Sequence, residues 1–322
     1  METPSSTRYP TPCVALVCLL ATSTWAFSQS SLSLATQAGE RQQITNESLG
    51  GGVRTNTLGG FSSFAPASPS DPDLGEQVLL QPAQQYQPFS IYTNWSGFWT
   101  SNPDLLDSSG GSDTFLVGTV GVNYLPYFGR NLFGEFTVQQ SIYRYATNSD
   151  LDFNALTATA GLIYVIREWD DLTLFARYEY DLLTPSGYNE DLFNDQSINF
   201  GLRKSWILNR AILAYGSLSA DFSLGGQPDD ALRNDFSALL GWQFGLTRVV
   251  KADIYYRASA QAYHADGRAD FNQLIGGGLT FDVTRWLSVQ TLSSIAINSS
   301  NDETYSYFAA NLGGGISLMV TF

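Results

Sequence analysis

The 322-residue chain has little charge, only two cysteines and a single histidine. Charged residues make up 14% of it, against about 25% in an average soluble domain. Both cysteines, Cys13 and Cys18, lie near the start of the chain. The remainder therefore has no disulfide framework, no cysteine metal cluster and no cysteine nucleophile.

Long apolar runs are also missing after residue 27, which excludes a protein that crosses a membrane with helices. No phosphate loop, zinc spacing or dinucleotide fingerprint occurs, so we expect no cofactor and no metal. A net charge of -14 disfavours nucleic acid as a partner. Aromatic residues are plentiful, at 14% of the chain, and this excludes a wholly disordered protein.

The first 28 residues have the layout of a secretory signal peptide. Arg8 precedes an uncharged run from Cys13 to Phe27, and small residues follow around Ala26 and Ser28. We therefore predict a cleaved signal over residues 1–28 and export of the remaining chain.

Residues 29–87 are rich in Gln, Ser, Gly, Thr and Pro and show no sustained periodicity. Such a composition does not bury a core, so we expect a disordered, flexible periplasmic segment. An alternative is a segment that folds back into a lumen or meets a periplasmic partner. The stretch EQVLLQ, residues 76–81, is the anchor we would expect for it.

Residues 88–322 alternate apolar and polar side chains in segment after segment, which is the signature of strands. Leu174, Ala176 and Tyr178 share one face, for example, while Arg177 and Glu179 share the other. Twelve such segments occur, near 89–100, 113–124, 132–146, 153–166, 172–183, 196–206, 211–224, 233–246, 250–263, 271–281, 286–298 and 305–322. A soluble sandwich has strands of about 5–6 residues, whereas these are long enough to cross a bilayer when tilted.

The connections alternate between short turns and longer loops that are rich in Asp, Asn, Ser and Gly. This alternation is typical of an all-β transmembrane barrel of the antiparallel up-and-down type, with its short turns in the periplasm. The pattern thus predicts a barrel of about 12 strands over residues 88–322. An even strand count places both termini on the periplasmic side.

The final segment ends with Ile316, Leu318, Val320 and the terminal Phe322 at alternate positions. Together with the twelve segments it resembles bacterial outer-membrane β-barrel proteins, and the likeness covers residues 89–322 without matching one subfamily. The resemblance implies a Gram-negative outer membrane, contact with outer-membrane lipids and lipopolysaccharide, and delivery to the barrel assembly machinery. Phe322, Val320 and Leu318 correspond to that family's assembly signature.

The inward parity of the strands carries charges of both signs, which predicts a wet lumen. The candidate pore-lining residues are Glu135, Arg177, Glu179, Asp181, Arg203, Asp221, Asp235, Lys251, Asp253 and Arg257. They suit a porin-like channel for small polar solutes, but they would also suit a lumen plugged by charges that pair across it. The long loops hold thirteen acidic residues against one basic residue, Arg268, so an acidic outer mouth would concentrate cations.

Catalysis is not expected. His264 lies on the outward parity, and its same-face neighbours Ala262 and Asp266 supply no serine for a nucleophile and base pair. We therefore name no catalytic residue. The alternatives to a channel are a non-conducting structural or surface-interaction barrel and, less favoured, an outer-membrane hydrolase.

Overall fold

The computed structural model describes residues 34–49, 86–107, 111–187, 191–265 and 267–322. The predicted signal at 1–28 and the stretch 76–81 lie outside these residues. One α-helix covers residues 34–49, here called the lumen helix. The strands are β1 (Phe89–Thr100), β2 (Asp113–Tyr124), β3 (Tyr127–Gly129), β4 (Leu132–Tyr145), β5 (Phe153–Ile166), β6 (Leu172–Pro185), β7 (Phe193–Asn209), β8 (Ile212–Gln227), β9 (Arg233–Gly245), β10 (Val250–Tyr263), β11 (Ala269–Asp282), β12 (Leu287–Ser300) and β13 (Tyr307–Thr321).

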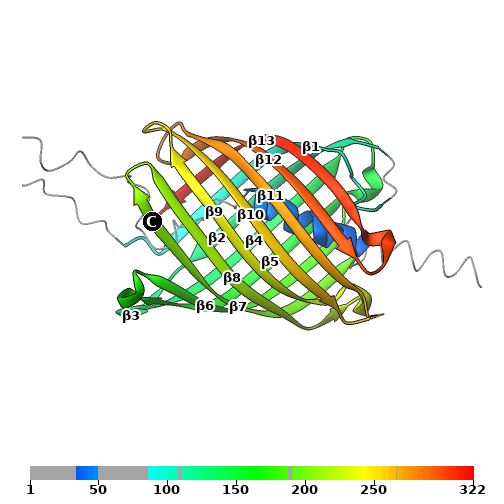
Figure 1. Ribbon diagram of the computed structural model, residues 1–322, viewed down its shortest axis with the longest axis horizontal. Helices are drawn as coiled ribbons and strands as arrows, with labels where there is room; N and C mark the ends of the chain where they lie inside the picture. Colours follow the sequence, from blue (N-terminus) through cyan, green and yellow to red (C-terminus); the bar gives the residue numbers. More distant parts are fainter. Residues whose placement is uncertain (1–33, 50–85, 108–110, 188–190, 266) are drawn as a thin grey trace, which may run out of the picture.

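Twelve of these strands form a closed antiparallel barrel (Figure 1). Each long strand pairs with its neighbours in the chain, and β1 closes the ring by pairing with β13 from Ser90↔Thr321 to Thr100↔Asn311. The additional strand β3 is three residues long and pairs only with β4 among the described residues. The predicted up-and-down barrel is therefore confirmed. Closure leaves no strand edge facing lipid.

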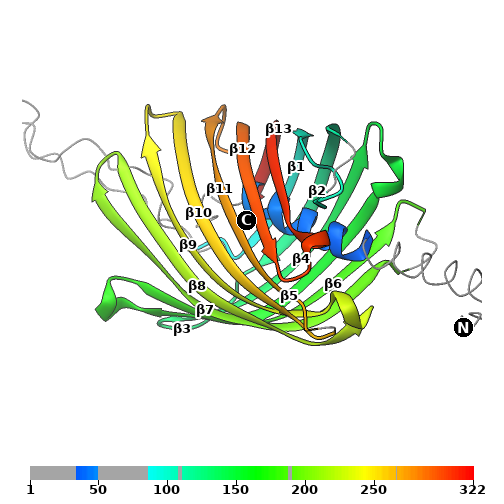
Figure 2. The same ribbon diagram turned by 45° about the vertical axis from the view of Figure 1, so that its right-hand side comes forward.

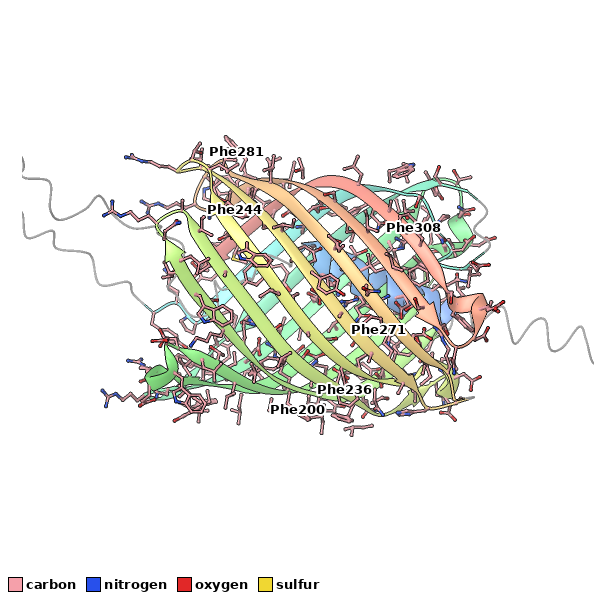
Figure 3. The ribbon with its side chains drawn as sticks, viewed as in Figure 1. Phe200, Phe236, Phe244, Phe271, Phe281 and Phe308 are labelled. Atoms are coloured by element: carbon pink, nitrogen blue, oxygen red, sulfur yellow. The ribbon has the colours of Figure 1, made fainter. Side chains whose placement is uncertain are left out.

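The outer face of the barrel is apolar, as a lipid-facing surface must be. Large side chains project outward around the wall, and Figure 3 labels Phe200, Phe236, Phe271 and Phe308 among them. These four rings are 46%, 51%, 45% and 56% exposed. So much exposed apolar surface would favour aggregation in water, whereas lipid chains would cover it in a bilayer.

Strand β6 shows how the alternation separates the two faces. Leu174 and Tyr178 are 37% and 42% exposed on the outside, whereas Phe175 is only 8% exposed on the inside. Phe175 is an apolar residue on a mostly polar inner face. Its ring packs against two guanidinium groups. Those of Arg177 and Arg203 lie 4.4 and 5.8 Å from the ring centroid and gain a cation–π contact.

The two rims of the barrel differ as the connections predicted. At one rim the turns are tight, and the turn after β5 holds η3 (Arg167–Trp169) followed by Asp170 and Asp171 in the left-handed region at φ 51° and 59°. The other rim carries the longer loops with η2 (Ser149–Leu151), η4 (Asp229–Ala231) and η5 (Glu303–Tyr305). Among the described residues, no helix is long and apolar enough to cross a membrane.

Candidate functional site: the lumen and its helix

The lumen helix lies inside the barrel (Figures 1 and 2). Its first turn is at the long-loop rim, where Ala35 lines a cavity with Phe193 and Ala231. The chain is next described at Tyr86, and Pro88 lies at the opposite rim, where its carbonyl accepts from Leu125 N. Residues 34–49 were expected within a disordered segment. The structure instead places residues 34–49 inside the lumen, as the alternative expected of part of this segment. The anchor expected for it, residues 76–81, lies outside the described residues.

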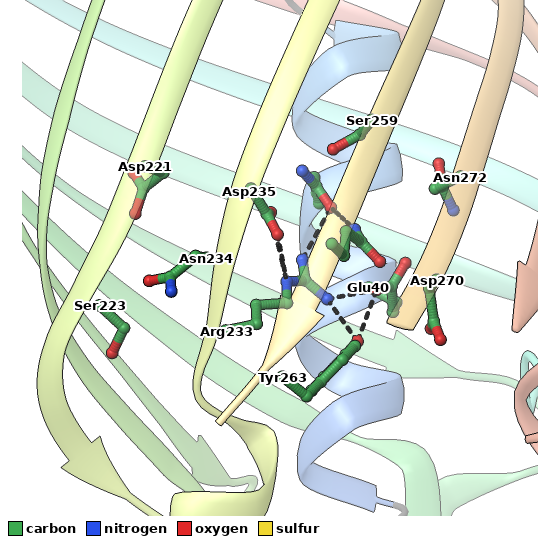
Figure 4. A network of polar contacts seen from close by, with 12 residues as sticks. Glu40, Asp221, Ser223, Arg233, Asn234, Asp235, Ser259, Tyr263, Asp270 and Asn272 are labelled. Atoms are coloured by element: carbon green, nitrogen blue, oxygen red, sulfur yellow. Dashed lines mark hydrogen bonds and ion pairs between the residues drawn. The ribbon is translucent and has the colours of Figure 1, made fainter. Parts of the chain in front are cut away.

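Glu40 anchors the helix to one wall through a buried charge network (Figure 4). Its side chain is 2% exposed and pairs with Arg233 of β9. Tyr307 of β13 donates its hydroxyl to Glu40 Oε2 at 3.0 Å, and Arg233 donates to Tyr263 Oη at 2.9 Å. Arg233 also pairs with Asp235 at 3.1 Å. A charge buried this deeply needs such partners to offset its lost hydration.

The next residue, Arg41, is 1% exposed and makes a second set of buried contacts with the barrel. Its Nη1 donates to Asn311 Oδ1 at 2.9 Å, and its Nη2 donates to the carbonyl of Asn102 at 2.6 Å. The guanidinium also lies 5.2 Å from the ring centroid of Phe115. Arg41 thereby ties the helix to β13 and to the loop that follows β1.

Apolar contacts complete the packing of the helix on this side. Ile44 is 2% exposed and packs in a cluster with Leu105, Leu274, Ala296 and Ala309. Small side chains at the last two positions let the helix backbone approach β12 and β13. Further along the helix, Ser48 Oγ lies 3.2 Å from Ser294 Oγ of β12.

Gln43 of the helix also accepts from Arg233 Nη2 at 2.9 Å, and two further residues of the helix make longer polar contacts. Gln42 Nε2 donates to Thr157 Oγ1 at 3.2 Å and to Asp181 Oδ1 at 3.4 Å. Glu47 lies 3.7 Å from Arg257 and is 31% exposed. The short or buried contacts of the helix are thus concentrated at Glu40, Arg41, Gln43 and Ile44, and Gln42 and Glu47 make longer ones.

Two cavities of about 480 and 470 Å³ lie beside the helix. The first reaches Pro88 and Thr321 at the short-turn rim, and the second reaches Phe193 and Ala231 at the long-loop rim. They adjoin, because both are lined by Asn46, Glu47, Thr137, Gln139, Thr159, Arg177, Asn199 and Ser219. A cavity this large and polar holds water. Together the two cavities extend from residues of the short-turn rim to residues of the long-loop rim.

Acidic side chains dominate the second cavity. The strand register places Asp181 directly opposite Asp195, and Asp221 directly opposite Asp235. Like charges in directly opposed positions repel each other. Their protein partners are mostly neutral: Asp181 accepts from Thr157 at 2.6 Å, Asp195 from Ser223 at 2.6 Å and Asp221 from Asn199 at 2.9 Å.

Two basic residues line the region where the two cavities meet, Arg177 on both cavities and Arg203 on the first. Arg177 Nε lies 2.7 Å from Glu135 Oε2 across β5, and Arg177 Nη1 lies 4.0 Å from Glu179. Arg203 lines the first cavity on the next strand. The guanidinium groups of Arg177 and Arg203 therefore face the acidic half of the lumen from the short-turn side.

All ten predicted lumen residues lie on the inner face. Seven of them line the two cavities, namely Glu135, Arg177, Glu179, Asp181, Arg203, Asp221 and Asp235. Lys251 instead pairs with Asp282 at 2.9 Å, Arg257 faces Glu47 of the helix, and Asp253 lies between them on the inward parity of β10. That they line a conducting pore stays a prediction.

The predicted assembly residues lie on the outer face of the closing strand. Phe322 and Val320 are 58% and 47% exposed, and Leu318 shares their parity. Phe322 N donates to the carbonyl of Phe89 at 2.9 Å, and Phe89 N donates to that of Phe322 at 3.4 Å. The last residue therefore closes the seam between β13 and β1. Its role in delivery to an assembly machinery is untested.

The residues that hold the helix are not among those predicted from the sequence. Glu40 and Arg41 fell in the segment expected to be disordered, and Arg233, Tyr263 and Tyr307 were not named as lumen residues. One signal was present: residues 34–49 contain no proline, Ser33 precedes them and Gly50–Gly52 follow. A serine start and a glycine stop are typical helix boundaries.

Two further groups bear on chemistry. His264 is exposed, and its Nε2 lies 3.3 Å from Asn234 Oδ1. Over the described ranges, no set of three or more His, Cys, Asp or Glu side chains is arranged to hold a metal ion.

No family model and no curated protein matches the chain. Similar solved structures include an outer membrane channel from Pseudomonas putida F1, with 14% identity over 73% of this chain and 96% of that one at a TM-score of 0.49. The likeness concerns the fold alone, a closed antiparallel β-barrel. The translocator domain of autotransporter NalP from Neisseria meningitidis also matches, with 11% identity over 73% and 90% of the two chains and a TM-score of 0.42. So does the NanC porin, with 9% identity over 70% and 98% and a TM-score of 0.40.

Proposed function

We propose that this outer-membrane barrel is a channel for small polar solutes, with a preference for cations, that conducts along the path beside the lumen helix. One observation carries the proposal: the two adjoining polar cavities reach from Pro88 at one rim to Phe193 at the other. A barrel built only as a scaffold has no need of such a path.

The preference for cations follows from the charge along that path. Glu179, Asp181, Asp195, Asp221 and Asp235 line the second cavity, against Arg177 and Arg233. The long loops add more acid at the same rim. Fixed carboxylates near a narrow aqueous path raise the local concentration of cations and repel anions.

Current through the refolded full-length protein in a planar bilayer tests the proposal. We expect small, steady single channels and, across a KCl gradient, a reversal potential of the sign that K⁺ selectivity gives. An anion-selective current would contradict the acidic path. No current from barrels that still shift on unheated gels would contradict conduction altogether.

A non-conducting surface or structural barrel is the second candidate, and the lumen helix favours it. Buried contacts at Glu40 and Arg41 hold the helix on one side of the lumen. If the wild-type protein carries no current but a protein lacking residues 34–49 does, the helix is a plug and the barrel is closed at rest.

The proposed orientation has the long loops outside the cell and the Phe322 end in the periplasm. Cysteine placed at Gly187, at the long-loop rim, should react with a membrane-impermeant thiol reagent on whole cells. Cysteine at Asn209, at the short-turn end of β7, should not react. The opposite pattern would exchange the two sides.

A further inference from the structure

Two charged side chains lie on the outward face of the strands that the structure describes. They are Arg144 of β4, which shares the parity of the exposed Phe136 and Val138, and Lys204 of β7, which shares that of Phe200 and Leu202. All acidic residues of the described strands have the inward parity. A cation on the lipid face costs about 2–4 kcal/mol at mid-membrane but little near the headgroups. The two residues lie at opposite rims, which fits two headgroup layers.

Lys204 has an acidic partner within the protein. Its Nζ lies 3.4 Å from Asp170 Oδ2 and donates to the carbonyl of Trp169 at 2.9 Å. Neutral polar groups on the outer face are paired as well, as where Tyr256 donates to Gln273 Oε1 at 2.9 Å. Arg144 differs, since no carboxylate of the described residues lies within ion-pair distance of it.

The guanidinium of Arg144 is held in one orientation. Its Nη1 donates to the carbonyls of Tyr143 and Phe153 at 2.7 and 2.9 Å, and its Nη2 donates to Asn154 Oδ1 at 2.7 Å. Asn154 is 1% exposed, and its own amide donates to the carbonyl of Pro185 at 3.0 Å. Among the described residues, Nε–H and the second Nη2 hydrogen have no acceptor. These two nitrogens form the edge of a guanidinium that chelates two oxygens of one phosphate.

An open notch of about 390 Å³ adjoins this arginine on the outer wall. Gly97, Leu116 and Arg144 are in register across β1, β2 and β4, and each contributes to its lining. No heavy atom lies within 4 Å of the position that a Cβ at Gly97 would take. Trp95 and Trp99 flank Gly97 on the same face, 47% and 42% exposed. Exposed tryptophans of this kind mark the headgroup level of a bilayer.

We propose that Arg144 and this notch bind the phosphate group of a membrane lipid at the long-loop side, with an acyl chain lying along Gly97 and Leu116. The geometry meets three needs of such a ligand. It offers a cation with no carboxylate partner among the described residues, a guanidinium edge whose hydrogens have no acceptor among them, and an apolar lining at Gly97 and Leu116 beside it. The site lies on the outside of the barrel and is independent of conduction through the lumen.

Native mass spectrometry of the full-length barrel tests this site. The protein would be released from mixed micelles that contain equal amounts of a phosphatidic acid and a phosphatidylcholine. We expect the wild type to retain phosphatidic acid in about tenfold excess, because its phosphate monoester carries more negative charge than the zwitterionic headgroup of phosphatidylcholine and so makes the stronger charge-assisted contact with Arg144. Arg144→Gln should abolish the excess, and Gly97→Leu should reduce it by filling the notch.

Two control variants and one competitor show whether the excess arises at Arg144. Arg144→Lys keeps the charge but loses the chelating edge, so we expect an intermediate preference. Lys204→Gln removes the other outward cation and should leave the excess unchanged. Inorganic phosphate at the same concentration should not displace the lipid, because it lacks the acyl chain. An unchanged preference in Arg144→Gln, or full displacement by inorganic phosphate, would overturn the proposal.

Discussion

The two walls of the lumen meet the helix in different ways. On β10–β13 the inward side chains in the half toward the long-loop rim are almost completely covered, with Ser259, Asn272, Ala296 and Ala309 all at 0% exposure. On β5–β8 the inward residues Thr157, Thr159, Asn199 and Ser219 stay half-buried and face the cavities. The helix is therefore docked on one wall and leaves the other wet.

Side-chain size and charge explain the difference. Small residues on the packed wall, such as Ala296 and Ala309, allow the backbone of the helix to come close. The open wall carries Asp181, Asp195 and Asp221 instead, whose repulsion and hydration oppose close packing. The same strands that would bind a helix poorly are those that would conduct cations well.

Deleting residues 34–49 should have the largest effect, because it exposes the packed wall to water as well as the open one. We expect the single-channel conductance to rise several-fold, since the helix fills much of the lumen cross-section beside the cavities. Planar-bilayer recordings measure the change. The shift of the unheated protein on gels confirms that the barrel still folds, and an unchanged conductance in folded protein would mean that ions do not pass beside the helix.

The second prediction weakens docking without removing the helix. Glu40→Gln removes the carboxylate that pairs with Arg233 of β9 and leaves Asp235 as the remaining acidic partner of that guanidinium; loss of one member of a buried pair costs up to about 3–5 kcal/mol. A cysteine at Ala38, which is 4% exposed in the helix, reports local release. Its labelling by a thiol reagent should accelerate by roughly 100-fold or more.

Glu47→Gln is the matched control for that experiment. Glu47 is 31% exposed and lies 3.7 Å from Arg257, so its loss should accelerate labelling only a few-fold. Equal effects of the two substitutions would mean that Glu40 is not the principal anchor.

The barrel itself could be predicted from the sequence because each face of each strand meets a different solvent. The observed β1, β2, β5 and β10 have the predicted bounds, and the other long strands differ by only a few residues at their ends. The short β3 was not predicted. The ends of β7 and β8 extend beyond the expected 196–206 and 211–224, because pairing continues past the apolar belt. The alternation of apolar and polar side chains does not show how far the backbones of two strands stay paired at the rims.

The lumen helix could not be predicted in the same way. A helix is recognised by an apolar stripe of period 3.6, but the lumen helix packs in a polar cavity and carries Glu40, Arg41 and Gln42 where a core helix would carry leucine. Its partners are equally hidden. Arg233 and Tyr307 lie far apart in the sequence and meet at Glu40 only because the barrel closes.

The smallest expected effect concerns selectivity on the open wall. Replacing Asp181 and Asp221 together by Asn removes two carboxylates from the second cavity but keeps the hydrogen bonds to Thr157 and Asn199 possible. We expect a reduced cation preference at low salt and little change at high salt, because the Debye length falls from about 30 Å at 0.01 M to about 3 Å at 1 M. Reversal potentials across KCl gradients at both ionic strengths measure the change in selectivity.

Asp170→Asn is the control, because it makes the same Asp-to-Asn change outside the lumen. The Asp170 side chain is 92% exposed at the short-turn rim. If that control shifts the reversal potential as much as the double variant, selectivity arises at the rims and not on the open wall.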